Sequence, residues 1–199
     1  APAQINIPRD LWTQVVDIEL PAIVEFELPS GGTDALAAAA ELLSNAKFPV
    51  ILNGAGVVLG AAIPASQALA ERLDAPVCCN YQHNDAFPGS HPLFAGPLGY
   101  NGSKAGMELI QQADVVLALG TRLNPFSTLP GYNLDYWPKD AKLIQVDINP
   151  DRIGLTKSVS VGIVGDAKRV AEQLLEQLAD HAGSAGRAER RNLIASKKS

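Results

Sequence analysis

The chain has 199 residues and a net charge of −5 at pH 7, and 47% of its residues are hydrophobic. This hydrophobic content is enough for a core and excludes wholesale disorder, while the negative charge argues against a general nucleic-acid binder. No apolar run approaches the roughly 18 residues that a membrane span needs, and the first residues show no signal peptide. The two cysteines, Cys78 and Cys79, are adjacent and cannot join distant segments by a disulfide. We therefore expect a cytoplasmic protein without membrane or nucleic-acid partners.

The residues before Gly32 are typical of a connection between domains. Residues 3–7 alternate apolar and polar side chains like a half-buried strand, and Pro8 ends the pattern. A strand without a partner nearby in the sequence is best explained as the last strand of a preceding domain, so we assign residues 1–10 to such a domain. Residues 11–31 are interrupted by Pro21 and Pro29 and carry scattered large apolar side chains. We predict a linker there that packs along a surface.

From Gly32 onward, short apolar segments alternate with helical patterns. The predicted helices cover residues 35–45, 63–73, 104–112 and 167–181, and the predicted strands cover residues 50–52, 76–80, 114–119, 143–148 and 161–164. This alternation predicts an α/β fold with a doubly wound, mostly parallel sheet of five or six strands and helices on both faces. Five strands are visible in the sequence, and a sixth would lie in the linker or in a loop.

Two connections of about twenty residues are long for a compact domain, and such loops usually bind a ligand or meet a partner. They cover residues 81–102 and 121–140. We predict that their aromatic side chains face other domains and promote self-association when exposed. These side chains are Phe87, Phe94, Phe126, Tyr132, Tyr136 and Trp137.

The last segment, residues 183–199, is basic and rich in small residues. It holds five basic side chains and one acidic side chain, which gives it a net charge of +4. Segments of this composition are typically solvated. We predict a linker to a following domain rather than a nucleic-acid-binding arm.

The candidate site lies beyond the carboxyl ends of the predicted strands, where open α/β sheets bind ligands. Glycine lets a phosphate approach the backbone, arginine pairs with phosphate, and aspartate accepts hydrogen bonds from a ribose. The residues at these ends are Gly54, Gly56, Gly120, Arg122, Asp147 and Asp166. Together they predict a nucleotide crevice with these six as cofactor-binding residues. Tight strand-to-helix turns without a ligand explain the glycines equally well.

Two departures argue against a nicotinamide dehydrogenase. The glycines at 54, 56 and 60 are spaced one residue wider than the dinucleotide fingerprint, and Asn80 stands where an acid is expected after the second strand. A possible metal group, Cys79, His83, Asp85 and His91, matches no common ligand spacing. We therefore expect a buried cysteine and loop histidines, and no metal site.

Several segments, in the right order along the chain, resemble thiamine-diphosphate enzymes of the acetolactate-synthase-like group. Residues 4–10 resemble the closing strand of their pyrimidine-binding domain. The segments that resemble their central domain are 53–56, 91–94, 98–102, 113–122 and 146–154. Within the group, the segments 80–88 and 124–138 are most similar to the sulfoacetaldehyde acetyltransferases.

The resemblance implies that residues 32–182 form a Rossmann-like central domain and that residues 183–199 lead to a diphosphate-binding domain. It implies an oligomeric parent that converts sulfoacetaldehyde and phosphate into acetyl phosphate and sulfite, or else an acetolactate synthase or related carboligase. Thiamine diphosphate and Mg²⁺ would be bound by domains outside this chain, so the chain alone should be inert. A stand-alone module that binds ADP or NAD is the alternative from another functional class.

Some relatives bind FAD or ADP in the central domain, and the resemblance implies the same six site residues for such a ligand. However, flavin-binding synthases tend to have Phe-Asp-Asp after the Gly-x-Arg motif, where this chain has Leu123-Asn124-Pro125. We therefore expect a vestigial crevice that is mostly empty.

Overall fold

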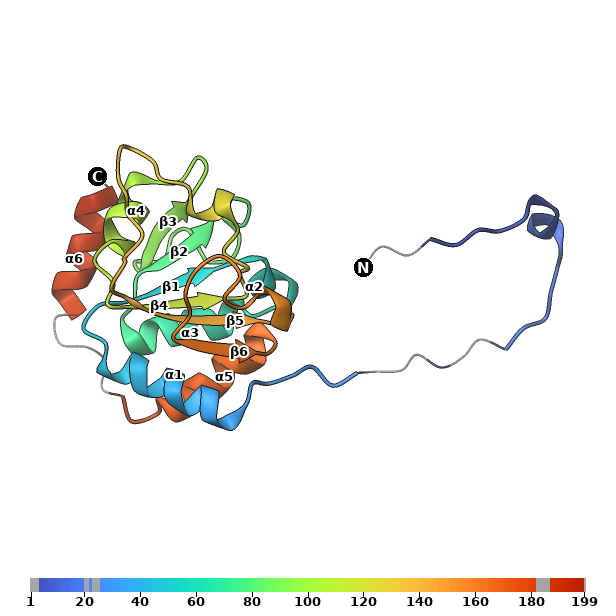
Figure 1. Ribbon diagram of the computed structural model, residues 1–199, viewed down its shortest axis with the longest axis horizontal. Coiled ribbons are helices and arrows are strands. Elements are labelled where there is room, and N and C mark those ends of the chain that lie inside the picture. The colour runs from blue at the N-terminus through green and yellow to red at the C-terminus, as the bar shows by residue number, and fades with distance from the viewer. Residues whose placement is uncertain (1–3, 20–21, 23–25, 182–186, 199) are drawn as a thin grey trace.

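The computed structural model describes residues 4–19, 22, 26–181 and 187–198. Its centre is a six-stranded sheet in which every strand is parallel to its neighbours, in the order β3-β2-β1-β4-β5-β6 (Figure 1). The strands are β1 (Pro49–Asn53), β2 (Val77–Asn80), β3 (Phe94–Leu98), β4 (Val115–Leu119), β5 (Lys142–Asp147) and β6 (Val161–Val164). The predicted doubly wound α/β fold is confirmed. The sixth strand is β3, and it lies inside the first of the two long loops.

The central strands are buried over their whole length. Every residue of β1 and β4 is buried, and the two strands pair in register from Pro49 and Val115 to Asn53 and Leu119. Nearly continuous apolar runs of this kind are what a strand covered on both faces requires. The chain order of the strands reverses between β1 and β4, so a crevice opens beyond their carboxyl ends.

The helices lie on both faces of the sheet. Three helices form one layer, in which α5 (Ala167–Gln177) packs against both α1 (Thr33–Asn45) and α3 (Ile63–Leu73) (Figure 1). The crossover from β3 back to β4 runs in the opposite direction to that from β1 to β2, so the right-handed rule puts α4 (Lys104–Ile110) on the other face. The short α2 (Ala55–Leu59) follows β1 directly. None of the helices in the described part of the chain is long and apolar enough to cross a bilayer.

The N-terminal arm runs away from the rest of the molecule (Figure 1). Its described residues from Gln4 to Ser30 are exposed, and they contain one short 3₁₀ helix, η1 (Arg9–Thr13). Residues 11–19, which were predicted to pack along a surface, are therefore exposed here, and the described contacts with the domain begin at Glu27, which pairs with Arg169 at 3.3 Å. Residues 4–7 form no strand here, and residues 1–3 lie outside the described part, so their assignment to a preceding domain stays a prediction. The arm meets the sheet where Asp166 N–H donates to the carbonyl of Pro29 at 2.7 Å.

The prediction of a solvated linker at the C-terminus was wrong for residues 187–198. They form helix α6 (Arg187–Lys198), which packs against α4 and β3 (Figure 1). Arg190 and Ile194 are only 6% and 1% exposed. Arg190, Leu193, Ile194 and Lys197 follow the i, i+3, i+4, i+7 spacing of one helical face, a pattern that counting charges does not detect.

The loop aromatics divide into two groups. Phe87 and Tyr136 are fully buried, and Phe94 and Trp137 pack against the core, so the prediction that these four face other domains was wrong. They fill the space under the long loops, where regular helices are short. Phe126 and Tyr132 are exposed, as expected.

Candidate functional site

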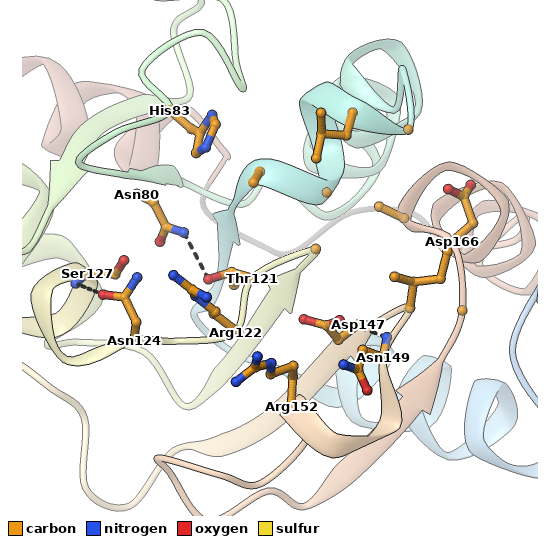
Figure 2. A pocket seen from close by; sticks show the side chains of 18 of the residues that line it. Asn80, His83, Thr121, Arg122, Asn124, Ser127, Asp147, Asn149, Arg152 and Asp166 are labelled. Atoms are coloured by element: carbon orange, nitrogen blue, oxygen red, sulfur yellow. Dashed lines mark hydrogen bonds between the residues drawn. The ribbon is translucent and has the colours of Figure 1, made fainter. Parts of the chain in front are cut away.

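A crevice of about 600 Å³ opens at the carboxyl ends of the strands, on both sides of the point where the strand order reverses. Five of the six predicted residues line it: Gly56, Gly120, Arg122, Asp147 and Asp166. Its size lies within the range of small-molecule sites. Figure 2 shows Asn80, Thr121, Arg122 and Asn124 on one wall, and Asp147, Asn149 and Arg152 on the other.

The glycines hold the β1 and β4 loops together. A Cβ at Gly54 would lie 2.5 Å from the carbonyl oxygen of Gly120 and 2.8 Å from the Cα of Thr121, and a Cβ at Gly56 would lie 2.7 Å from the Cα of Gly120. Gly54, the sixth predicted residue, does not line the crevice. Gly56 N–H donates to the carbonyl of Gly120 at 2.8 Å, so one amide of the β1–α2 turn is already engaged. The close approach of two loops accounts for these glycines without a ligand.

Two arginines supply positive charge to the crevice. Arg122 follows β4, and Arg152 ends the 3₁₀ helix η3 (Pro150–Arg152), whose N-cap Asn149 accepts a hydrogen bond from Asp151 N–H at 2.9 Å. Both side chains are exposed, and neither forms an ion pair with any residue that the structure describes. Unpaired guanidinium groups at the mouth of a crevice suit an anionic group such as a phosphate.

The two aspartates are partly engaged by the backbone. Asp166 caps α5, where its Oδ1 accepts hydrogen bonds from the N–H groups of Lys168 and Arg169, both at 3.1 Å. Asp147 Oδ1 accepts from Asn149 N–H at 2.9 Å. Each carboxylate keeps its second oxygen, and only Asp147 is free of a helix-capping role. Asp147 is therefore the better candidate for a ligand hydroxyl.

Sequence analysis missed a polar bridge over the end of β1. Asn80, at the end of β2, donates through Nδ2 to Thr121 Oγ1 at 2.9 Å, and Asn80 Oδ1 is buried without a hydrogen-bond partner (Figure 2). The sequence did contain a hint, because Asn80 stands where an acidic residue was expected, but no role was predicted for its amide. Other lining residues that were not predicted include His83, Asn124, Ser127, Asn149 and Arg152. Their loops carry no periodic pattern that would place them.

The suggested metal group does not assemble. Cys79 is buried in β2, and burial raises the pKa of its thiol to about 12, so it is neither a thiolate nucleophile nor a ready metal ligand near neutral pH. His83 lies 3.6 Å from Asp85, whereas His91 pairs with Glu71 at 3.0 Å. Within residues 4–19, 22, 26–181 and 187–198, no three His, Cys, Asp or Glu side chains are grouped to hold a metal ion.

The comparisons with known proteins decide the family. Residues 36–174 match the family described as thiamine pyrophosphate enzyme, central domain. The chain belongs to this family. Its described residues include no group of three or more His, Cys, Asp or Glu side chains that could hold Mg²⁺. The described residues thus offer no side-chain cluster of this kind for the metal of the coenzyme, and no catalytic step is assigned to them.

Two relatives of this chain share one name. The chain is 76% identical over 199 residues to the sulfoacetaldehyde acetyltransferase of Roseovarius nubinhibens and 68% identical to that of Rhodobacter capsulatus, and both matches cover 100% of this chain. A probable acetolactate synthase large subunit of Methanocaldococcus jannaschii is 35% identical over 89% of the chain. The chain spans 33%, 34% and 31% of the lengths of these relatives, so it is similar to about a third of each.

Solved structures support the fold. A benzoylformate decarboxylase from Polynucleobacter necessarius gives a TM-score of 0.68 at 24% identity, covering 84% of this chain and 31% of that one. A putative thiamin diphosphate-dependent enzyme from Mycobacterium smegmatis gives a TM-score of 0.64 at 29% identity, covering 78% and 30%. The central domain thus has the architecture of its counterparts in larger enzymes.

Proposed function

We propose that this chain is the central part of a thiamine-diphosphate-dependent sulfoacetaldehyde acetyltransferase, which converts sulfoacetaldehyde and phosphate into acetyl phosphate and sulfite. The observation that carries the proposal is the 76% identity to a protein of that name over all 199 residues. The 35% identity to an acetolactate synthase supports that alternative much less. The reacting groups would lie in the remaining two-thirds of the parent, together with Mg²⁺.

The role of the central domain in this proposal is architectural. The preceding pyrimidine-binding domain would end in residues 1–10, and α6 would lead to a following diphosphate-binding domain. A homo-oligomeric parent fits the resemblance, because in this group the coenzyme lies between domains of two subunits. A cytoplasmic location fits the two free, buried cysteines, which form no disulfide.

The activity assay uses the full-length parent and the isolated chain side by side. With thiamine diphosphate, Mg²⁺, sulfoacetaldehyde and phosphate, we expect the parent to release sulfite and the isolated chain to release none, because in this proposal the coenzyme and Mg²⁺ are bound by the other domains. Sulfite is measured by its cleavage of a chromogenic aromatic disulfide, which releases a coloured thiolate. Turnover by the isolated chain would contradict the architectural role, and a parent that consumes pyruvate instead of sulfoacetaldehyde would favour an acetolactate synthase.

For the crevice we infer a vestigial nucleotide site lined by Gly56, Gly120, Arg122, Asp147 and Asp166, with Gly54 in the turn beside them and not in the lining. The engaged Gly56 N–H supports a loss of phosphate binding, and the capping role of Asp166 leaves its carboxylate less available to a ribose hydroxyl. We expect the purified parent to show no flavin absorption and no micromolar binding of ADP in calorimetry. A yellow protein, or tight ADP binding that Arg122→Ala abolishes, would instead assign the crevice to a functional cofactor.

A further inference from the structure

Two loops next to α4 form an exposed apolar surface, which we call the aromatic patch. It consists of Tyr100, Phe126, Leu129, Pro130 and Tyr132. Tyr100 N–H donates to the carbonyl of Phe126 at 2.9 Å, and Tyr132 OH donates to the carbonyl of Gly102 at 3.1 Å, so the two loops are joined. The side chains of Tyr100, Phe126 and Tyr132 are 54%, 58% and 59% exposed.

The aromatic patch is free of charge over an unusually long stretch. Residues 123–134 and 99–103 contain no Asp, Glu, Lys or Arg, although charged residues make up 19% of the chain. Beside the patch lies a hollow of about 250 Å³, lined by Gly99–Gly102, Met107 and Leu129–Tyr132. Aromatic side chains without charges, around a hollow, are the composition of the core of a protein interface.

The two loops of the aromatic patch contain non-glycine residues with left-handed backbone conformations. Asn101, Tyr132 and Asn133 have φ values of 55°, 53° and 58°, in the left-handed region, which asparagine tolerates but which is unfavourable for a bulky residue such as Tyr132. Gly131 and Leu134 form a bridge around the pair 132–133, as in a tight hairpin turn with two left-handed residues. Such strain persists when surrounding contacts enforce it, and it concentrates at functional sites. The turn therefore holds Tyr132 outward on a fixed support.

The chain leaves the domain close to the aromatic patch. Glu108 on α4 lies 3.6 Å from Lys104 Nζ, two residues after Gly102, and 2.7 Å from Lys197 Nζ near the end of α6. Figure 1 shows the C-terminal end of the described chain beside α4. Whatever follows residue 199 in a longer parent therefore begins close to α4, the helix that directly follows the patch loop containing Tyr100. The relatives are about three times as long as this chain.

We propose that the aromatic patch is the docking surface for the domain that follows residue 199 in the same polypeptide. This inference rests on the proposed function, because it requires the chain to be part of a longer enzyme. The partner surface should be apolar and uncharged, since a charged surface would lose its hydration against these side chains without gaining an ion pair.

The test uses the full-length parent with the photo-crosslinking residue p-benzoylphenylalanine in place of Tyr132 and, in a second variant, in place of Tyr100. The matched control carries the same residue in place of Glu41, which is exposed on α1. After irradiation, denaturing electrophoresis separates crosslinks within one chain from crosslinks between chains, and mass spectrometry identifies the attached peptide. We expect both patch variants to give products with the mobility of one chain, attached to peptides beyond residue 199.

Three outcomes would overturn the proposal: attachment to peptides that precede this chain, products with the mobility of two chains, or no more crosslinking than at Glu41. Sulfite release by the same variants keeps the two ideas apart. If the enzyme is active on sulfoacetaldehyde but the crosslinks form elsewhere, only the docking proposal is refuted. If the expected crosslinks form but the enzyme is inactive on sulfoacetaldehyde, only the proposed substrate is refuted.

Discussion

Replacing Gly54 by alanine is expected to lower the free energy of unfolding by about 3 kcal/mol, the upper part of the range for overpacked positions. The new Cβ would lie 2.5 Å from both the carbonyl oxygen of Gly120 and the Cβ of Thr121, and 2.8 Å from the Cα of Thr121. These contacts are mostly backbone, so no side-chain rotation relieves them. The β4 loop would have to move away from β1 and weaken the ladder at the centre of the sheet. Urea denaturation followed by circular dichroism measures the change.

Gly89→Ala is the matched control for this substitution. Gly89 is exposed, and an added Cβ there meets no atom within 4 Å. We expect this variant to change the stability by less than about 1 kcal/mol. Equal stability of the Gly54 and Gly89 variants would mean that the β1 and β4 loops do not touch as described.

Replacing Arg190 by alanine is expected to cost about 3 kcal/mol, as breaking a buried charge pair does. The guanidinium donates to the carbonyls of Asp74 at 3.0 Å and Lys47 at 2.7 Å, and it lies 5.0 Å from the centre of the Phe48 ring. The carboxylate of Asp74 is fully buried and would lose a neighbouring positive charge. The same denaturation experiment should show the loss. Hydrogen exchange should show that α6 opens before the sheet does.

Two further variants test how much of the expected loss of stability is specific to the Arg190 guanidinium. Arg191, whose Nε lies 3.5 Å from Asp74 Oδ1, has a side chain that is 43% exposed, so Arg191→Ala should have a clearly smaller effect. Arg190→Lys keeps the charge and loses the fork of donors, and we expect an intermediate loss. If Arg191→Ala lowered the free energy of unfolding by about 3 kcal/mol and Arg190→Ala did not lower it, α6 would not be held by Arg190 as described.

The sequence predicts most of the fold because a parallel sheet buried on both faces leaves a strong local pattern. The apolar runs that became β1, β4 and β5 are visible in the sequence, and residues 63–73 and 161–164 match α3 and β6 at both ends. Strand β3 gave no such signal. It contains Gly96, with φ of +109°, and Pro97, and its pairing with β2 shifts register. Proline and glycine in a strand are tolerated at the edge of a sheet, where β3 lies.

The site could be predicted in position but not in chemistry. The ends of the strands locate the crevice, because topology places them along one edge. Whether Gly56 N–H faces a phosphate or the carbonyl of Gly120 depends on how closely two loops approach, and no local pattern records that distance. Arg152 was missed for a similar reason, since a 3₁₀ turn after β5 brings it back to the crevice.

The intact mass of the polypeptide encoded by the native gene tests the central claim most directly. If this chain is the central domain of a thiamine-diphosphate enzyme, that mass should be about three times the 21.0 kDa of this segment, as in the relatives that it matches over a third of their length. A native polypeptide close to 21.0 kDa would contradict the account, because the domains assigned to catalysis would then not exist.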